Sequence, residues 1–307
     1  MDDLTVKETA EKWGISDRRV RILCSEGKIP YVIRKGRSYQ IPEDAVKPVD
    51  GRSYRYKTIP DRFSEQFLHI DSLKEEISRY RPLTQGELER LREEFLIEYT
   101  YNSNAIEGNT LTLQETALVL EGVTIDKKPL KDHLEAVGHK DAFLFVEKLA
   151  RDLSPLTEHD IKQIHTLVLA DRPEDRGLYR RIPVRISGAY HQPPEPVQIP
   201  GLIEKLLQEF SDNQMHPIER AALFHLKFEG IHPFVDGNGR TGRLIMNLSL
   251  MQEGYLPIDI KYTDRKRYYD AFDSYYRDGS SDEMTELVTG YIEERQERML
   301  SILSGRY

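Results

Sequence analysis

The sequence predicts a mainly α-helical protein, with a small winged helix-turn-helix domain at the N-terminus and a larger helical body that carries one β-hairpin. Three observations lead to this fold class. Two short amphipathic segments joined by a glycine-containing turn begin the chain, and hydrophobic residues recur at helical spacing from residue 59 onward. The length of 307 residues is also about twice that of one ordinary domain.

The composition indicates a folded protein without membrane segments. Hydrophobic residues make up 38% of the chain and charged residues 31%, which is enough for a sizeable core. No uncharged apolar run approaches the length of a transmembrane helix, and the first residues lack the hydrophobic region of a signal peptide. The single cysteine, Cys24, excludes a disulfide framework and a cysteine-based zinc site. We therefore expect a soluble, cytoplasmic protein with no membrane partner.

The first 25 residues predict two short helices. Thr5 and Glu8 form a capping box before a helix over Val6–Trp13. Gly14 ends this helix, and a second helix runs from the cap at Ser16 to about Ser25. Two short helices around a turn that contains glycine are typical of a helix-turn-helix.

Residues 31–41 then predict two short strands around a turn at Lys35 and Gly36, which would form a wing. With this addition residues 1–48 resemble the winged helix-turn-helix of the excisionase and MerR-like group. The segments that carry the resemblance are Leu4–Ala10, Gly14–Ser16, Glu26–Pro30, Gly36–Arg37 and Ile41–Pro42.

The net charge of −8 conceals an uneven distribution of charge. Residues 16–40 contain seven basic and two acidic residues, whereas the chain from Gly51 onward has 34 basic and 43 acidic residues. A basic head is typical of binding to double-stranded DNA. The side chains expected to contact DNA are Arg18, Arg19 and Arg21 on the second helix and Arg34, Lys35 and Arg37 at the wing. The alternative is a module for protein contacts whose charges form a solvated face.

Polar residues with Gly and Pro at 49–60 predict a linker. The body then divides into a helical region at 61–150 and a core with C-terminal helices at 151–307. Hydrophobic residues follow the i, i+3, i+7 stripe in two places, at Leu88, Leu91, Phe95 and Leu96 and at Ile161, Ile164, Val168 and Leu169. Alternation over Val184–Pro194 breaks the helical pattern and predicts the small hairpin.

The segment His232–Arg243, HPFVDGNGRTGR, is the most informative in the chain. Its glycines fit G-x-G-x-x-G, but a helical pattern precedes them where a dinucleotide site requires a strand. No Lys-Ser/Thr pair follows the glycines, which excludes a P-loop. The backbone N–H groups of Gly237, Asn238 and Gly239 can instead form an anion site at the start of a helix that runs from Arg240 to about Gln252.

Three further side chains of this segment suit a polyphosphate. Arg240 and Arg243 lie one turn apart and offer two guanidinium groups. Asp236 can hold Mg²⁺ against phosphate oxygens, since magnesium prefers a carboxylate together with phosphates. The imidazole of His232 could take a proton from an attacking hydroxyl.

The segment resembles the signature of the Fic family, H-P-F-x-[D/E]-G-N-[G/K]-R-x-x-R, at every defined position. This resemblance implies transfer of AMP from ATP to a Ser, Thr or Tyr hydroxyl of a protein, with release of pyrophosphate. It implies His232 as the base, Asp236 as the Mg²⁺ ligand, Gly237–Gly239 as the anion hole, and Arg240 and Arg243 as phosphate ligands, with Arg243 nearest the γ-phosphate. The alternative is a structural His-Pro loop with a glycine-rich cap.

Other segments also resemble the family, among them Leu156–His165, Gly177–Arg180 and His191–Pro194. The resemblance implies that the flap at 184–192 pairs with an extended stretch of the target protein and so aligns its hydroxyl. A plain surface hairpin is the alternative. We expect His133, His165 and His225 to be packing or surface residues, and we assign no zinc.

Ser103–Asn109 resembles the family's inhibitory motif [S/T]-x-x-x-E-[G/N] and follows the amphipathic stretch Leu83–Tyr101. The resemblance implies that Glu107 pairs with Arg243 and takes the place of the γ-phosphate. In some family members this glutamate instead orients a water that removes AMP from the modified target. An ordinary helix C-terminus at Gly108 is the alternative to both.

The family pattern places a tyrosine near adenine, and Tyr268 and Tyr269 lie at the matching distance. The segment Asp273–Arg277 departs from the pattern, which makes adenine specificity less secure. Both tyrosines could equally be core residues.

The sequence thus favours a self-inhibited protein adenylyltransferase with a DNA-binding head. The alternatives are a transcription regulator whose Fic domain senses nucleotide or modifies itself, a de-AMPylase that uses Glu107, and transfer of a phosphate or phosphocholine group. A homodimer is expected because twofold dimers predominate among oligomers and suit palindromic DNA.

Overall fold

The fold is described from a computed structural model of the whole chain. The structure describes residues 3–25, 29, 32–36, 38–43, 45, 47, 60–80, 83–185, 191–211 and 214–305. The linker predicted at 49–60 lies outside these residues except for Pro60. The hairpin predicted over Val184–Pro194 lies outside them at residues 186–190, and the described residues on either side form no strand.

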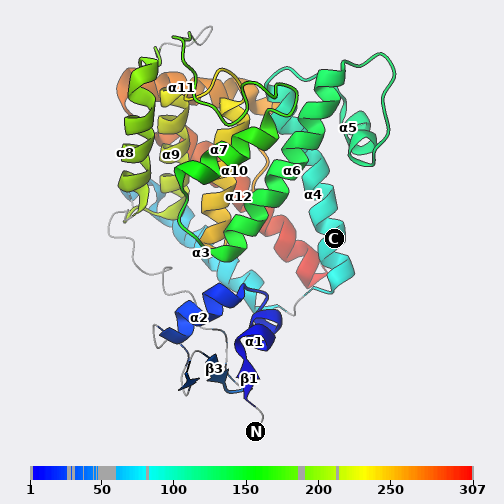
Figure 1. The fold of residues 1–307 in the computed structure, drawn as a ribbon, viewed down its shortest axis with the longest axis vertical. Coiled ribbons are helices and arrows are strands. Elements are labelled where there is room, and N and C mark those ends of the chain that lie inside the picture. The colour runs from blue at the N-terminus through cyan, green and yellow to red at the C-terminus, as the bar shows by residue number, and fades with distance from the viewer. Residues whose placement is uncertain are drawn as a thin grey trace. The chain divides into compact units, whose positions relative to one another are not determined.

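The chain divides into two compact units. The smaller unit comprises Met1–Arg55 and Glu147–Ser154, and the larger comprises Tyr56–Val146 and Pro155–Tyr307. In Figure 1 the N-terminal part is dark blue, and the larger unit runs from cyan to red.

The smaller unit contains the predicted helix-turn-helix with a three-stranded sheet. Its elements are β1 (Leu4–Thr5), α1 (Val6–Trp13), α2 (Asp17–Ser25), β2 (Ile33–Lys35) and β3 (Ser38–Ile41). The Thr5–Glu8 capping box is present, and Gly14 ends α1 in the left-handed conformation with φ 64°. Ser16 caps α2 through a bond from the Arg19 amide to its hydroxyl oxygen, 3.3 Å long.

The strand β1 was not predicted. It pairs antiparallel with β3, Leu4 opposite Ile41, and β3 pairs antiparallel with β2. A strand of two residues is too short to show the period-2 alternation by which strands are recognised in a sequence. Its pairing closes the wing over a small core of buried side chains, Val6, Ala10, Val20, Leu23, Cys24, Ile29 and Ile41.

The larger unit is helical, which confirms the predicted fold class, and every strand among the described residues lies in the smaller unit. Its α-helices are α3 (Ser64–Arg79), α4 (Gln85–Ile106), α5 (Leu113–Leu120), α7 (Glu158–Val168), α8 (Ile199–Ser211), α9 (Pro217–Ile231), α10 (Asn238–Gln252), α11 (Arg265–Asp278) and α12 (Asp282–Ser304), together with α6 (Leu130–Asp152) up to Val146. Short 3₁₀ turns at Asp61–Phe63, Pro196–Gln198 and Tyr262–Asp264 precede α3, α8 and α11.

The helices α9 and α10 pack against each other at the centre of this unit, with α7 against α10 and with α8 and α12 against α9. The predicted stripe of α7 is confirmed, since Ile161, Ile164 and Val168 are all fully buried. The stripe predicted in α4 holds at Phe95 and Leu96, which are buried, but is wrong at Leu88, which is 48% exposed. The helix α10 buries nearly every side chain along its length. The residues at its N-terminal end are therefore held by the core, as a preorganised site requires.

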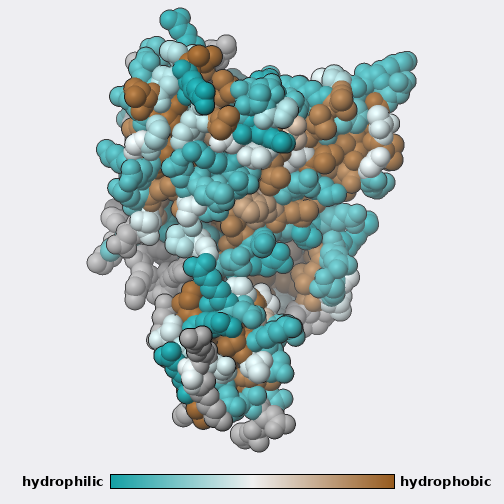
Figure 2. All heavy atoms as spheres, viewed as in Figure 1, coloured by the Kyte–Doolittle hydropathy of each residue, from teal (hydrophilic) through white to brown (hydrophobic). Residues whose placement is uncertain are grey.

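No helix in the described ranges is both long and apolar enough to cross a bilayer. Figure 2 shows hydrophobic side chains gathered on the exposed surface over α5 and the adjoining part of α6. These exposed residues are Leu113, Leu118, Val123, Leu130, Leu134 and Val137.

Candidate active site

The loop between α9 and α10 carries the predicted motif, and two left-handed residues shape it. His232 is the C-cap of α9, with φ 47°, and Gly237 is the N-cap of α10, with φ 75°. The left-handed conformation suits glycine but is strained for histidine, so its neighbours must hold the backbone at His232. The side chain of Asn238 closes the loop by accepting from the Phe234 amide at 2.9 Å and donating to the Phe234 carbonyl at 3.0 Å.

The helix α10 begins at Asn238, two residues before the predicted start at Arg240. The amide groups at the start of a helix have no partner within it, so they form a site for an anion. The carboxylate of Glu107 lies against this site: a Cβ built on Gly239 would collide with its Oε1 and would lie 3.0 Å from Nη1 of Arg243. A side chain at 239 would therefore displace the Glu107 carboxylate, and this anionic group lies beside a residue whose amide is predicted to bind phosphate.

Arg243 is 1% exposed, and each of its three nitrogens makes a hydrogen bond. Nη2 donates to Oε1 of Glu107 at 2.8 Å and to the Ser103 carbonyl at 2.7 Å. Nε donates to the Ser103 hydroxyl at 3.1 Å, and Nη1 donates to the Tyr268 hydroxyl at 3.1 Å. The predicted Glu107–Arg243 pair is thus present, and the end of α4 supplies further acceptors that the motif did not reveal.

The two tyrosines of α11 occupy different environments. Tyr268 is 1% exposed and holds Arg243 through its hydroxyl, so it is the core residue of the two alternatives and does not face an adenine. Tyr269 is 44% exposed, and its hydroxyl donates to the Ile106 carbonyl at the end of α4, 3.3 Å away. The contact to adenine is therefore retained as a proposal for Tyr269 alone.

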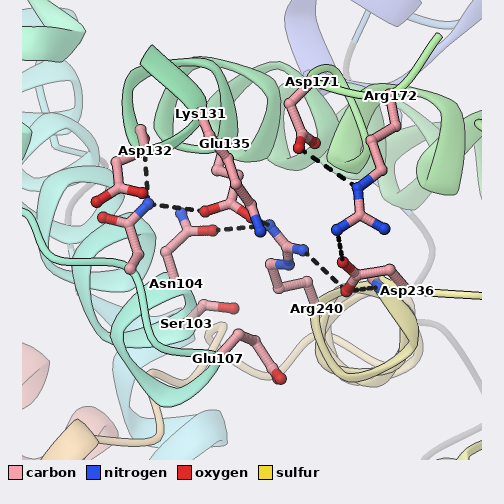
Figure 3. A network of polar contacts seen from close by, with 12 residues as sticks. Ser103, Asn104, Glu107, Lys131, Asp132, Glu135, Asp171, Arg172, Asp236 and Arg240 are labelled. Atoms are coloured by element: carbon pink, nitrogen blue, oxygen red, sulfur yellow. Dashed lines mark hydrogen bonds and ion pairs between the residues drawn. The ribbon is translucent and has the colours of Figure 1, made fainter. Parts of the chain in front are cut away.

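Arg240 is also buried, and its partners differ from those of Arg243. Nη1 lies 2.9 Å from Oε1 of Glu135 on α6, while Nη2 lies 3.5 Å from Oδ1 of Asp236. Figure 3 shows Arg240 between Glu135 and Asn104 on one side and Asp236 on the other. Since two carboxylates flank this arginine, its position is fixed before any phosphate arrives.

Glu135 was not predicted as a site residue, and it joins Arg240 to the segment after the inhibitory motif. Its Oε2 accepts from the side chain of Asn109 at 2.9 Å, which also donates to the Asp132 carbonyl at 3.1 Å. Glu135 is 5% exposed and lies on a helix whose sequence pattern is that of an ordinary packed helix. A buried carboxylate needs such partners, but no local spacing in the sequence reveals them.

Asp236 presents a carboxylate that is ionised and partly open to solvent, with 33% of its side chain exposed. Burial raises the pKa of Asp236, but the charge of Arg240, the Gly237 amide and the charge of Arg172 outweigh burial and lower that pKa. Nη2 of Arg172 lies 3.0 Å from its Oδ2. An ionised carboxylate beside an anion site fits the donor set of Mg²⁺ with a polyphosphate.

His165 packs behind the motif loop, as the prediction of a packing role expected. Its Nε2 lies 3.0 Å from the Asp236 carbonyl, and its Nδ1 accepts from the Gly177 amide at 2.8 Å. The ring stacks on Phe234 with centroids 3.6 Å apart. Burial lowers the pKa of His165 to about 4, so the ring is neutral and donates through Nε2.

Arg180 binds the motif loop from the other side, and residue types alone did not single it out. Its Nε donates to the His232 carbonyl at 2.8 Å, which holds the strained backbone at that residue. Nη1 and Nη2 donate to the carbonyls of Ile182, at 3.1 Å, and Pro194, at 2.6 Å. One buried guanidinium thus ties His232 to both ends of the segment that contains residues 184–192.

In the smaller unit, the side chains of Arg18, Arg21 and Arg34 are exposed. Arg19 is 7% exposed, so the prediction that it projects from α2 to contact DNA is wrong. It occupies the buried face of the helix next to Val20. The side chains of Lys35 and Arg37 lie outside what the structure describes.

Comparison with known families and proteins agrees with both predicted domains. Residues 155–250 match the Fic/DOC family, and residues 4–47 match a family described as helix-turn-helix domain. The chain is similar to a protein named Protein adenylyltransferase Fic from Nematostella vectensis, with 35% identity over 73% of this chain and 54% of that protein. Its namesake from Drosophila melanogaster is 37% identical over 65% of this chain and 41% of the relative. The chain thus spans about half the length of these relatives or less.

Solved structures give the same result. A Fic domain containing signaling protein from Bacteroides thetaiotaomicron superposes with a TM-score of 0.70 and 26% identity over 79% of this chain and 99% of that one. Fic-1 from C. elegans superposes with a TM-score of 0.71 and 28% identity over 79% of this chain and 73% of the other. The protein therefore carries a Fic/DOC family domain at residues 155–250, preceded by a helix-turn-helix domain at residues 4–47.

Proposed function

We propose that the protein transfers AMP from ATP to a Ser, Thr or Tyr hydroxyl of a protein, and that Glu107 restrains this transfer through Arg243. The observation that carries the proposal is the position of the Glu107 carboxylate, which lies beside Gly239 and bonds Arg243 at 2.8 Å. A buried guanidinium that holds an anionic group next to a helix N-terminus suits a polyphosphate. Relatives named as adenylyltransferases support AMP as the transferred group.

The residues of the motif loop have distinct roles in this reaction. The target hydroxyl oxygen attacks the α-phosphorus of ATP, the bond from that phosphorus to the bridging oxygen breaks, and pyrophosphate leaves. His232 takes the hydroxyl proton, and the amides at 237–239 with Arg240 and Arg243 bind the phosphate oxygens. Mg²⁺, held by Asp236, would neutralise phosphate charge when bound.

Glu107 restrains transfer because it competes with nucleotide for the same donors. Four of the five N–H groups of this guanidinium are bonded to Glu107, Ser103 and Tyr268, and both N–H groups of Nη2 are among them, so the γ-phosphate cannot form a bidentate contact with it. A nucleotide that lacks this contact binds with its α-phosphate misplaced, and misplacement of the reacting atoms by about 1 Å can cost on the order of 10²-fold in rate. Removal of the carboxylate should therefore raise transfer.

Two parts of the proposal concern partners. The target would dock on the flap at 184–192 and would thus present its hydroxyl to His232. Arg180 holds the carbonyls of Ile182 and Pro194, which lie on either side of the flap. The smaller unit would bind double-stranded DNA through Arg18, Arg21 and Arg34, the exposed arginines of α2 and the wing. A homodimer is a further prediction, which light scattering in solution would test.

The alternative functions use the same residues. A regulator that senses nucleotide or modifies itself would need the phosphate-binding residues of the motif loop but no separate target protein. A de-AMPylase would instead use Glu107 to orient a water. Transfer of a phosphate or phosphocholine group would attach that group to the protein in place of AMP. The intact His232 favours turnover over sensing, since binding alone needs no base.

The test uses ATP labelled on the α-phosphate and, separately, on the γ-phosphate, with Mg²⁺ and a lysate as the source of targets. The variants are Glu107→Gly and Glu107→Gly with His232→Ala. Protein-bound α-label with the first variant, no γ-label, and a loss of at least about 10²-fold with the second would support AMP transfer. Protein-bound γ-label would contradict it and indicate phosphate transfer. The absence of both labels would favour the sensor or the de-AMPylase.

A further inference from the structure

Three buried side-chain atoms beside the motif loop have no hydrogen-bond partner among the described residues. They are Nδ1 of His225, Oε1 of Glu229 and Nδ1 of His232. A buried polar atom without a partner is costly, and a group of them indicates a function or a contact that forms only in another state. Two of the three are imidazole nitrogens, and the third belongs to the carboxylate of Glu229, which lies near both histidines.

Glu229 lies three residues before His232, one turn earlier at the end of α9. Its Oε2 is 3.7 Å from Nδ1 of His232, which is longer than a hydrogen bond. The side chains are 13% and 19% exposed, so both are largely screened from water. Hydrogen bonds of catalytic groups are often long before substrate binds and shorten in the substrate complex.

A hydrogen bond at Nε2 fixes the tautomer of His225. Its Nε2 lies 2.7 Å from the Tyr268 hydroxyl, which already accepts from Arg243. The tyrosine proton therefore points to Nε2, and the proton of the neutral histidine is on Nδ1. Burial, together with the charge of Arg243, lowers the pKa of His225 to about 3, so this ring stays neutral at working pH.

Gly242 on α10 brings the Nδ1 of His225 close to Glu229. A Cβ built on Gly242 would lie 2.5 Å from Nδ1 of His225 and 3.3 Å from Oε1 of Glu229. Both atoms thus lie over the backbone of Gly242, in space that any side chain there would fill. The glycine lets α10 approach α9 closely enough for the carboxylate to remain enclosed between the two histidines.

Other titratable and charged groups face this pair from neighbouring elements. They are Arg180, bound to the His232 carbonyl, Arg243 of α10, and Tyr268, Tyr269 and Tyr276 of α11. Burial is the first cause that raises the pKa of each of these tyrosines, and the charge of Glu229 adds to it. The tyrosines therefore remain neutral and do not titrate near neutral pH.

We propose that Glu229 is a positioning residue for His232, whose carboxylate accepts the Nδ1 proton so that Nε2 carries the lone pair that receives the hydroxyl proton. This inference rests on the proposed AMP transfer. As Nε2 takes the proton from the target oxygen, the ring becomes an imidazolium, and the carboxylate stabilises that charge. An aspartate has this role beside the histidine of the Ser-His-Asp triad.

The test uses the Glu107→Gly protein as the parent and adds Glu229→Gln, which keeps the shape and removes the charge. The matched control is Glu219→Gln, which changes another glutamate of α9 at the far end of the helix. For each protein the kcat at neutral pH is measured at saturating ATP, together with the KM for ATP. The ¹⁵N shifts of the His232 imidazole, assigned with His232→Asn, give its tautomer without turnover.

The proposal predicts two results for Glu229→Gln. The kcat at neutral pH falls at least about tenfold while the KM for ATP stays within about twofold. The ¹⁵N shifts of His232 report a smaller share of the Nδ1–H tautomer, because a neutral amide is a weaker acceptor than a carboxylate, and Glu219→Gln changes neither result.

An unchanged His232 tautomer in Glu229→Gln would overturn the proposal, even with a lower kcat, because the glutamate would then act only on structure. The NMR readout also separates this result from a failure of the proposed function. A parent without AMP transfer would contradict the function, whereas the effect of Glu229 on the His232 ring would still be measured.

Discussion

The two parts of the molecule use arginine in opposite ways. Arg18, Arg21 and Arg34 of the smaller unit are exposed, with their charges in solvent. Arg240 and Arg243 of the larger unit are each 1% exposed and held by carboxylates. An exposed charge acts over a Debye length and tolerates changes of geometry, whereas a buried guanidinium acts through the directions of its donors. Sequence alone shows the residue type in both places, and burial decides which of these properties matters.

The largest effect is expected where arginine is buried. In the Glu107→Gly protein, Arg243→Lys should lower AMP transfer about 10²-fold or more, because lysine cannot reproduce bonds from Nε, Nη1 and Nη2 at once. The rate of α-label incorporation measures the effect. The matched control, Arg277→Lys, changes an exposed arginine of α11 and should leave the rate unchanged. Equal rates in the two variants would contradict a geometric role for Arg243.

A smaller effect is expected for exposed arginines. Arg18→Ala with Arg21→Ala should weaken DNA binding about tenfold and reduce the slope of log K against log salt by roughly 0.9 for each phosphate that the protein no longer neutralises. The lysine versions should retain most of the affinity, because binding to a phosphate needs charge more than geometry. Fluorescence anisotropy with a random duplex at several salt concentrations provides both numbers.

Arg19 is the internal control for that experiment. Because its side chain is buried, Arg19→Ala should leave the salt slope unchanged while it lowers the stability of the smaller unit. A slope that falls equally for Arg19→Ala and Arg18→Ala would mean that the burial of Arg19 does not persist on DNA.

In the intact protein, salt concentration should affect DNA binding much more than AMP transfer. Between 50 and 200 mM salt, DNA binding through several phosphate contacts should fall by roughly 10²-fold or more, since counterions compete at the exposed charges. Transfer by Glu107→Gly should change by no more than about threefold, because the buried arginines are screened little. Both quantities are measured as the concentration of potassium chloride is varied at fixed free Mg²⁺ and ATP. A steep fall of transfer would place solvent-exposed charges at the active site.

The smallest effect concerns helix caps, which both units share. Thr157→Ala removes a hydroxyl that accepts from the Asp160 amide at 3.2 Å at the start of α7, and it should lower the free energy of unfolding by about 1 kcal/mol. Thr5→Ala in the smaller unit should have an effect of the same kind and order. Urea denaturation followed by circular dichroism measures both. A much larger loss from either variant would show that the cap also holds tertiary structure.

The features that the sequence predicted are local ones. The capping box at Thr5, the stripe of α7 and the motif 232–243 depend on neighbours within about two turns, so their spacing is visible in the chain. The Glu107–Arg243 pair spans 136 residues, and only the resemblance of two motifs to one family predicted it. Glu135 and Arg180 were missed because their partners come from distant segments. Glu229 lies only three residues before His232, and it was missed because the sequence does not show that both side chains are largely buried.

Burial also explains what became of two other expectations. Arg19 was expected to contact DNA because it lies on the second helix of the helix-turn-helix, and Tyr268 was placed near adenine by the family pattern, with a core position as the alternative. Each lies on the inner face of its helix, 7% and 1% exposed, next to residues whose side chains do face outward. A shift of one position around a helix turns a side chain by about 100°, and a short pattern does not fix that angle to within one residue.

The most direct test of the account compares the wild-type protein with Glu107→Gly and Glu107→Gln at equal concentrations of ATP, Mg²⁺ and target. The initial rate of α-label incorporation and the affinity for ATP are measured for each protein. Glu107→Gly should transfer at least about tenfold faster than wild type, and Glu107→Gln should lie between them, because its amide is neutral and competes weakly for Arg243. Equal rates in all three proteins would contradict the claim that Glu107 withholds Arg243 from the nucleotide.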